Sequence, residues 1–303
     1  SKDNLRSTTK PKTHHIRHRT TQLLNALRQL PGRFHDLLCN PVDVASLVFF
    51  RIAFGAIMLW EVVRYFQFDR IAQYYAEPRF HFNYFGFEWI HPWSYTGMNM
   101  HFAALGVLAF LITIGFCYRI ATILFFLGFT YVFLLDQTQY LNHFYLICLI
   151  SFLLILIPAH CAGSVDAWLR PNLRRRHVSG WALRLLQVQI AIVYFYGGVA
   201  KINADWLNCR PVADWISRRT DLPFIGPWLA EPAAGWIVAY GGLAFDLAVV
   251  PLLCWRKTRP YAFVVAMLFH LTNSQLFHIG VFPWFMMAAT AMFFRPDWPR
   301  KLL

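Results

Sequence analysis

The chain has 303 residues, of which 57% are hydrophobic and only 14% are charged. Soluble domains carry about 25% charged residues, so this composition excludes an ordinary water-soluble protein. It predicts an all-α, polytopic transmembrane bundle, because helices satisfy the backbone within lipid. The net charge of +13 does not indicate nucleic-acid binding, since the basic residues lie at the ends of predicted helices without a nucleic-acid motif. Six cysteines without a CxxC pair give no support for structural zinc, thioredoxin-like chemistry or c-type haem.

The N-terminal part, residues 1–40, is predicted to be a basic tail followed by an interfacial amphipathic helix. His14, His15 and His18 could bind a metal, but their polar, basic surroundings favour a solvated tail. Apolar residues then recur at helical spacing between Leu23 and Leu38, with arginines alongside, which is typical of a helix lying on a membrane surface. The remaining residues, 41–303, form the predicted transmembrane domain.

Within this domain the apolar runs predict seven to nine spans. A 30 Å hydrocarbon core requires about 20 residues per helix. Several runs are shorter than this, so the number of spans is predicted only as a range. Residues 66–100 contain Trp, Tyr, Phe, Pro and Asn without a clean period, and they predict an interfacial or re-entrant stretch. The eight runs assigned as spans are 44–64, 101–116, 119–135, 141–158, 181–200, 235–254, 260–276 and 278–294.

The distribution of basic residues predicts the orientation of the bundle. Cytoplasmic loops are enriched in Lys and Arg, so the basic tail places the N-terminus in the cytoplasm. Each loop after an even-numbered span is then cytoplasmic, and each is basic, including 170–176, 256–259 and 295–301. The segment 202–234 is an exception, since it carries three arginines on the outer side, balanced by four acids.

Polar groups at membrane depth are costly and therefore mark candidate sites. The first is Lys201, which follows an apolar run and the pair Gly197-Gly198 at the outer end of the fifth span. Glycines allow another helix or a ligand to approach closely, and desolvation would favour a neutral amine that can act as a base. The alternative is a lysine that extends to the interface and pairs with Asp205.

The second site, residues 135–145, is the predicted outer turn between the third and fourth spans. It contains Asp136, Asn142 and His143. An imidazole here could transfer protons or donate to a developing anion. The alternative interpretation is an ordinary capped helix start at the interface.

The third site, residues 269–278, places His270, Asn273 and Gln275 towards the outer end of the seventh span. So many hydrogen-bonding side chains are hard to explain by packing alone. A fourth location comprises Asp246 in the sixth span and Arg51 in the first. Neither should remain unpaired, so either the two pair with each other or Asp246 orients a site residue.

The first three clusters all fall at the outer face, which predicts one cavity with polar groups and aromatic walls that suits an amphiphile arriving from lipid. Metal and nucleotide chemistry have no support in the sequence. A di-iron carboxylate site needs two Glu-x-x-His motifs with further glutamates, whereas the chain has four Glu and one such motif, Glu88 to His91. GxGxxG, P-loop and HExxH motifs are also missing.

Short strings along residues 41–303 resemble the membrane domain of the vitamin K-dependent γ-glutamyl carboxylase family. They occur in order and include Phe50-Arg51, Cys117-Tyr118-Arg119, Tyr131 to Asp136, Asn142-His143, Ser164-Val165-Asp166, Ile192-Val193-Tyr194-Phe195, Lys201 with Ala204-Asp205-Trp206, Asn273 to Phe277, Ile279-Gly280 and Trp298 to Leu302.

The resemblance implies that vitamin K hydroquinone is oxidised by O₂ to the epoxide, and that the base formed removes a γ-proton from peptidyl glutamate before CO₂ is captured. Lys201 would deprotonate the hydroquinone and His143 would assist at the carbanion or CO₂ step. A quinone reductase would supply the hydroquinone, and the site would face the non-cytoplasmic side. The cofactor-binding residues would be Asn142, His270, Asn273, Gln275, Asp136 and Tyr194.

Two departures from the family bear on this expectation. Animal members carry two adjacent lysines where this chain has Ala200-Lys201. The family also has a soluble portion after the membrane domain that recognises the substrate protein, and the given sequence ends at Leu303. A quinol oxidase or epoxidase without carboxylation, and a non-catalytic membrane lipid-binding protein, remain alternatives.

Overall fold

The computed structural model describes residues 32, 35–36, 38–223, 225–277 and 279–302. The predicted N-terminal tail and most of the predicted interfacial helix lie outside these residues, as does His278.

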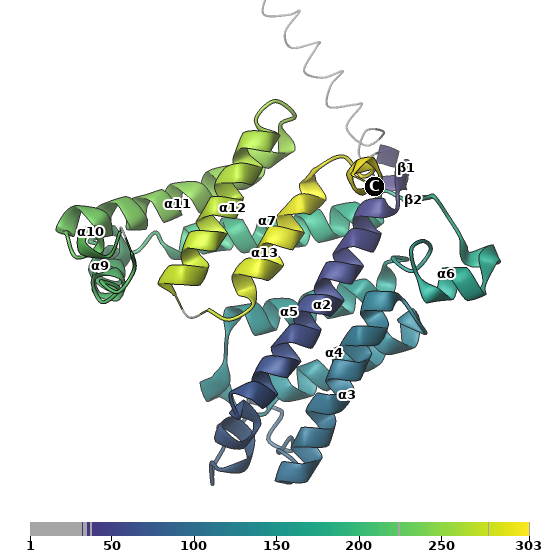
Figure 1. The fold of residues 1–303 in the computed structure, drawn as a ribbon, viewed down its shortest axis with the longest axis horizontal. Coiled ribbons are helices and arrows are strands. Elements are labelled where there is room, and N and C mark those ends of the chain that lie inside the picture. The colour runs from purple at the N-terminus through teal and green to yellow at the C-terminus, as the bar shows by residue number, and fades with distance from the viewer. Residues whose placement is uncertain (1–31, 33–34, 37, 224, 278, 303) are drawn as a thin grey trace, which may run out of the picture.

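The described part is almost entirely helical (Figure 1). In chain order its elements are β1 Pro41–Asp43, α2 Ala45–Gln67, the π-helix η1 Ala72–Ala76, α3 Tyr95–Ile114, α4 Tyr118–Leu134, the 3₁₀ helix η2 Gln137–Gln139, α5 Asn142–Leu156, α6 Val165–Leu169, η3 Pro171–Leu173, β2 His177–Ser179, α7 Trp181–Ala200, α8 Ala204–Leu207, α9 Arg210–Ser217, α10 Gly226–Leu229, α11 Pro232–Cys254, α12 Arg259–Leu276, α13 Phe282–Thr290, η4 Ala291–Phe293 and η5 Trp298–Lys301.

Each segment predicted as a span contains a helix, but the helix in the last segment, α13, has only nine residues, and two boundaries differ. α3 begins at Tyr95 rather than at residue 101, because the side chain of Ser94 caps the helix by accepting a hydrogen bond from the Gly97 amide. The interfacial stretch is therefore shorter than predicted. α13 ends at Thr290 and continues as the 3₁₀ helix Ala291–Phe293, so the last predicted span is the least regular.

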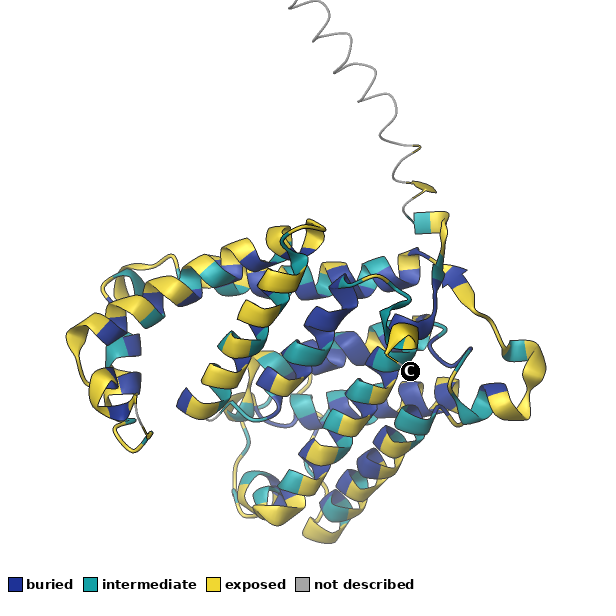
Figure 2. Ribbon diagram, turned by 45° about the horizontal axis from the view of Figure 1, so that its top comes forward, coloured by how far each residue is buried: buried dark blue, intermediate teal, exposed yellow. Residues whose placement is uncertain are grey.

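Four helices of the described residues are both long and apolar enough to cross a membrane: α2, α3, α7 and α11. The apolar helices α4, α5 and α13 are shorter. Figure 2 shows exposed residues along the outer faces of these helices and buried residues along the inner faces. The exposed side chains include Phe110 of α3 and Leu127 of α4, both about half exposed. Such surfaces are suited to contact with lipid rather than water.

The predicted cytoplasmic loops come together at one end of the bundle. β1 pairs antiparallel with β2, which joins the start of α2 to the start of α7. The amide of Val44 donates to the carbonyl of Arg176, and Arg300 forms an ion pair with Asp43. The C-terminus lies near β1 and β2 (Figure 1). The basic segments 170–176 and 295–301 therefore lie on the same side, as alternating spans require.

Arg51 secures this end of the bundle without a carboxylate partner. Its fully buried guanidinium donates to the carbonyls of Ala159, Thr113, Ala162 and Gly163. The predicted pairing of Arg51 with Asp246 is therefore wrong. Helix ends and the following loop leave carbonyls without helical partners, and these carbonyls accept from both terminal nitrogens of the guanidinium, whereas Nε has no partner among the described residues.

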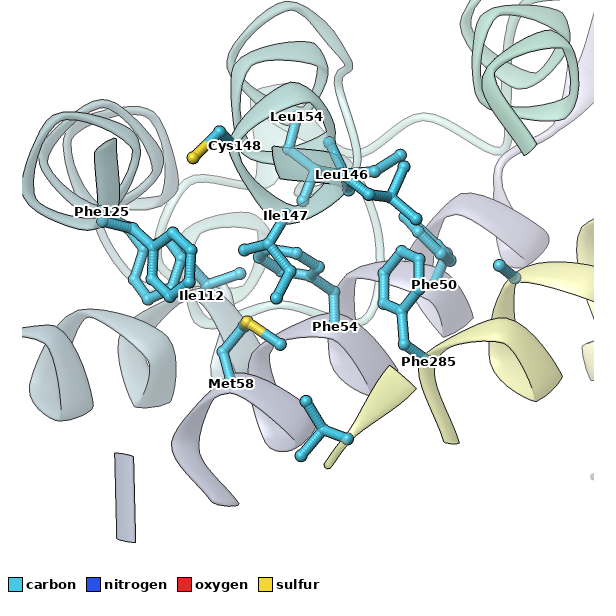
Figure 3. Close-up of a cluster of buried hydrophobic side chains, with 14 of the residues drawn as sticks. Phe50, Phe54, Met58, Ile112, Phe125, Leu146, Ile147, Cys148, Leu154 and Phe285 are labelled. Atoms are coloured by element: carbon cyan, nitrogen blue, oxygen red, sulfur yellow. The ribbon is translucent and has the colours of Figure 1, made fainter. Parts of the chain in front are cut away.

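The core of the bundle forms where α2 meets α4, α5 and α13 (Figure 3). Phe54 of α2 lies edge-on to Phe125 of α4 and to Phe285 of α13, with ring centroids 5.9 and 6.4 Å apart. Ile147 of α5 is also buried there. Both α5 and α13 also contribute residues to the site described next.

Candidate functional site

A cavity of about 550 Å³ lies between α5, α7, α11, α12 and α13. Its walls are mainly aromatic and aliphatic, with Tyr140, Tyr145, Phe269 and Phe282 among them. We call it the Lys201 cavity. The predicted site residues that it brings together come from all three outer polar clusters and from α7: Asn142, Tyr194, Lys201, His270 and Asn273.

Gly197 and Gly198 allow α7 and α11 to meet at this cavity. A Cβ on Gly198 would lie 2.6 Å from Cδ2 of Leu247, and a Cβ on Gly197 would lie 3.3 Å from Oδ2 of Asp246. Real side chains do not tolerate the first of these distances. The predicted close approach at this glycine pair is therefore confirmed, and the partner is α11.

Lys201, at the C-terminal end of α7, forms an ion pair with Asp246 of α11. Its Nζ also donates to the carbonyl of Gly197 at 3.0 Å and lies 5.1 Å from the ring of Trp206. The lysine side chain is 20% exposed and the aspartate side chain 9%. The pair therefore occupies a largely dry site in which each charge neutralises the other.

This pairing changes two expectations about the lysine. Asp205, the predicted interfacial partner of Lys201, instead lies 3.9 Å from Arg210. The amine is not an isolated group that desolvation alone controls, because a carboxylate shares its site. Of the two alternatives for Asp246, the structure supports the one in which it orients a site residue.

Tyr194 and His270 form a second polar group in the cavity. The Tyr194 hydroxyl lies 2.7 Å from Nε2 of His270 and 2.8 Å from Oγ1 of Thr290, and Thr290 donates to the carbonyl of Met286. Thr290 has one hydroxyl proton, so Tyr194 donates to Thr290 and accepts from Nε2 of His270. Nδ1 of His270 is then an unprotonated acceptor, and it is buried without a partner among the described residues.

His143 faces a neighbouring cavity of about 550 Å³ rather than the Lys201 cavity. Tyr140, Asn142 and Phe282 line both cavities and so form the wall between them. Nevertheless, the imidazole ring lies 5.8 Å from the Phe282 ring. The structure therefore places the two predicted catalytic residues on opposite sides of a shared wall.

Two predicted cofactor-binding residues lie elsewhere. Gln275 is exposed, and its side-chain amide donates to the hydroxyl of Ser274. Asp136 is buried but accepts hydrogen bonds from the amides of Thr138 and Phe82, which organises the turn before α5. Asp136 is thus the N-cap of the short helix η2, as the capped-helix interpretation expects, whereas α5 itself begins without a side-chain cap.

Sequence reasoning missed the charged residues of the second cavity, Glu61, Arg64 and Arg70. A signal was present, because Glu61 and Arg64 stand three residues apart at the end of an apolar run. Such an i,i+3 pair on one helix face is easily taken for a surface pair. Glu61 is in fact only 3% exposed. Among the described residues, no group of three His, Cys, Asp or Glu side chains could hold a metal ion.

The chain belongs to the HTTM domain family, whose profile matches residues 39–298. This family includes vitamin K-dependent γ-carboxylase, so the chain is a membrane protein related to that enzyme. A comparison with solved structures gives no match.

Proposed function

We propose that this HTTM-family protein oxidises vitamin K hydroquinone with O₂ and uses the base that is formed to carboxylate a glutamyl side chain with CO₂. The observation that carries the proposal is the Lys201–Asp246 ion pair inside an aromatic cavity at the end of α7. A naphthoquinol is a flat, neutral amphiphile, and mainly apolar walls with a few polar groups suit it.

The ion pair supplies the proton acceptor. If the ammonium and carboxylate are charged, the quinol hydroxyl transfers its proton to Asp246, while Lys201 stabilises the phenolate. If instead the proton of the pair resides on Asp246, Lys201 is a neutral amine and takes the quinol proton directly. Both routes end with a protonated carboxyl, an ammonium and a phenolate, so the proton belongs to the pair rather than to either residue.

His270 supports the proposal at the other polar group of the cavity. Its Nδ1 is an acceptor without a partner among the described residues, and leaving such a group unsatisfied costs about 1–3 kcal/mol. Because Nδ1 is buried, a quinol hydroxyl reaches it only if the imidazole turns towards the cavity that it lines. Asn142 and Asn273, which also line the cavity, offer further donors and acceptors to the ring oxygens.

The overall reaction balances without a metal. The hydroquinone and O₂ give the epoxide and one water, so one oxygen atom enters the ring and the other leaves as water. The γ-carbon of the glutamyl residue loses a proton and forms a bond to CO₂. His143, beyond the shared wall, would assist at the carbanion or at the CO₂ step. A quinone reductase in the same membrane would regenerate the hydroquinone.

Purified protein in lipid nanodiscs, given hydroquinone and O₂ with or without a glutamyl peptide and labelled CO₂, tests the proposal. We expect epoxide and peptide-bound label from the wild type and neither from Lys201→Ala. Epoxide without label would favour a quinol epoxidase that lacks carboxylation. Ala200, which stands where animal members carry a second lysine, makes that outcome the specific alternative. Equal background turnover by both proteins would support a non-catalytic lipid-binding role.

A further inference from the structure

The second cavity, which we call the Arg64 cavity, has an excess of positive charge. Its charged lining consists of Glu61 and Arg64 from α2 and Arg70 from the segment that follows. Glu61 lies 2.7 Å from Arg64 and 3.7 Å from Arg70, so one carboxylate faces two guanidinium groups. The cluster carries a net charge of +1 before His143 is considered, and a missing anion would neutralise it.

The two arginines retain hydrogen-bonding capacity towards the cavity. A guanidinium has five N–H donors, and Glu61 engages one terminal nitrogen of each arginine. The Arg64 and Arg70 side chains are 16% and 26% exposed, and both line the cavity. Their partial exposure leaves N–H donors available to a ligand there. Paired arginines suit a planar oxyanion, because two parallel N–H groups match two carboxylate oxygens.

The Arg64 cavity lies next to the Lys201 cavity, with which it shares a wall. Thr138, Gln139 and Leu141 from the turn before α5 line it on one side. Asn142 and Phe282 form the wall shared with the Lys201 cavity. An acid bound to Arg64 would thus lie next to His143 and one wall away from the ion pair. A volume of about 550 Å³ accommodates a side chain with flanking atoms as well as a small ion.

From this charge, geometry and position, we infer that the Arg64 cavity binds the carboxylate of the second substrate through Arg64 and Arg70. This deepens the proposed function, on which it rests for the identity of the reaction but not for binding. The ligand is a planar oxyanion, which could be supplied either by the acidic side chain of a peptide or by bicarbonate. Glu61 holds the two arginines in place and limits their affinity by competing for them.

Ligand-observed NMR on the protein in nanodiscs, without quinone and under argon, tests binding alone. The probes are N-acetyl-L-glutamate N-methylamide, its glutamine analogue and sodium bicarbonate. We expect saturable binding of the glutamate probe, weakened about tenfold by R64Q or R70Q, since a charge-assisted hydrogen bond of about 1.5 kcal/mol corresponds to that factor. The neutral glutamine analogue should bind at least tenfold more weakly than the glutamate probe. The matched control is R79Q, because Arg79 is exposed and does not line the cavity.

E61Q distinguishes a binding role from a structural one. Removing the competing carboxylate raises the net charge of the cluster to +2, so the glutamate probe should bind more tightly, whereas general damage to the cavity would weaken it. E61Q therefore tests whether the two arginines bind the carboxylate even if the arginine variants fail to fold. Wild-type affinity in the R64Q/R70Q double variant, equal binding of the glutamine analogue, or weaker binding in E61Q would overturn the inference. Competition by bicarbonate at similar concentration would assign the site to the small oxyanion.

The two proposals can fail separately. D246N and K201A alter the Lys201 cavity and should leave binding of the glutamate probe unchanged, because neither residue lines the Arg64 cavity. Loss of quinol oxidation with intact probe binding would count against the proposed reaction alone. Intact carboxylation in R64Q/R70Q would count against this inference alone.

Discussion

Replacing Asp246 by Asn tests the ion pair as a proton-transfer unit. The substitution keeps the shape of the side chain but removes the carboxylate that pairs with Lys201, whose side chain is 20% exposed. Breaking a buried pair by removing one partner destabilises a protein by about 3–5 kcal/mol, and the partial exposure of Lys201 places the expected loss at the lower end. Loss of a positioned proton acceptor lowers turnover by about 10²–10⁴-fold.

The double variant K201L/D246N provides the decisive comparison. If the two residues act as one unit, turnover of the double variant should be no lower than that of either single variant. Its thermal stability should exceed that of D246N, because no unpaired charge remains in the cavity. Epoxide formation measured by chromatography and unfolding measured by intrinsic fluorescence, both in nanodiscs, give the two quantities. Wild-type turnover in a folded D246N protein would refute the reasoning.

Three further predictions concern two contacts at the site and one histidine in the loop after α5. Tyr194→Phe removes the hydroxyl that orients His270, so the KM for hydroquinone should rise about fivefold at a cost near 1 kcal/mol, with a smaller change in kcat; an unchanged KM would argue against the assigned tautomer. Gly198→Ala should lower stability by about 1–3 kcal/mol through contact with Leu247, and Leu247→Ala in the same chain should restore part of it, as thermal unfolding would show. Burial chiefly, and also the charge of Arg119, lowers the pKa of His160, in the loop after α5, below 6.5. Folding therefore favours neutral imidazole, and stability should decline as the pH falls below about 6.5 towards the folded pKa; His160→Gln should reduce this decline in unfolding scans at pH 5 and 7.

The helices could be predicted because lipid leaves the backbone few alternatives. An apolar run must form a helix there, so the eight runs gave the approximate positions of eight helices, of which four are long and apolar enough to cross a membrane. The error at α3 arose because Asn99 interrupts the apolar pattern, although the helix had already begun at the Ser94 cap. A capping residue was thus a better boundary signal than hydropathy.

The pairing of charges could not be predicted in the same way. Asp246 and Lys201 are 45 residues apart, and their contact depends on how α7 and α11 are rotated and how closely they approach. Gly197 and Gly198 predicted that another element approaches α7 closely, but not that this element is α11. Arg51 shows the same difficulty, since a buried cation was expected to need a carboxylate, whereas four carbonyl groups accept from its two terminal nitrogens.

The two cavities differ in net charge, and this difference suits two substrates of different kinds. In the Lys201 cavity a lysine and an aspartate neutralise each other, so a neutral quinol can enter from lipid without meeting an uncompensated charge. In the Arg64 cavity two arginines face one glutamate, and the excess charge attracts an anion from water. Exchanging the substrates would place an anion beside Asp246 and leave an arginine unneutralised. The wall of Tyr140, Asn142 and Phe282 could therefore keep the substrates apart while allowing a strong base formed on one side to act on the other.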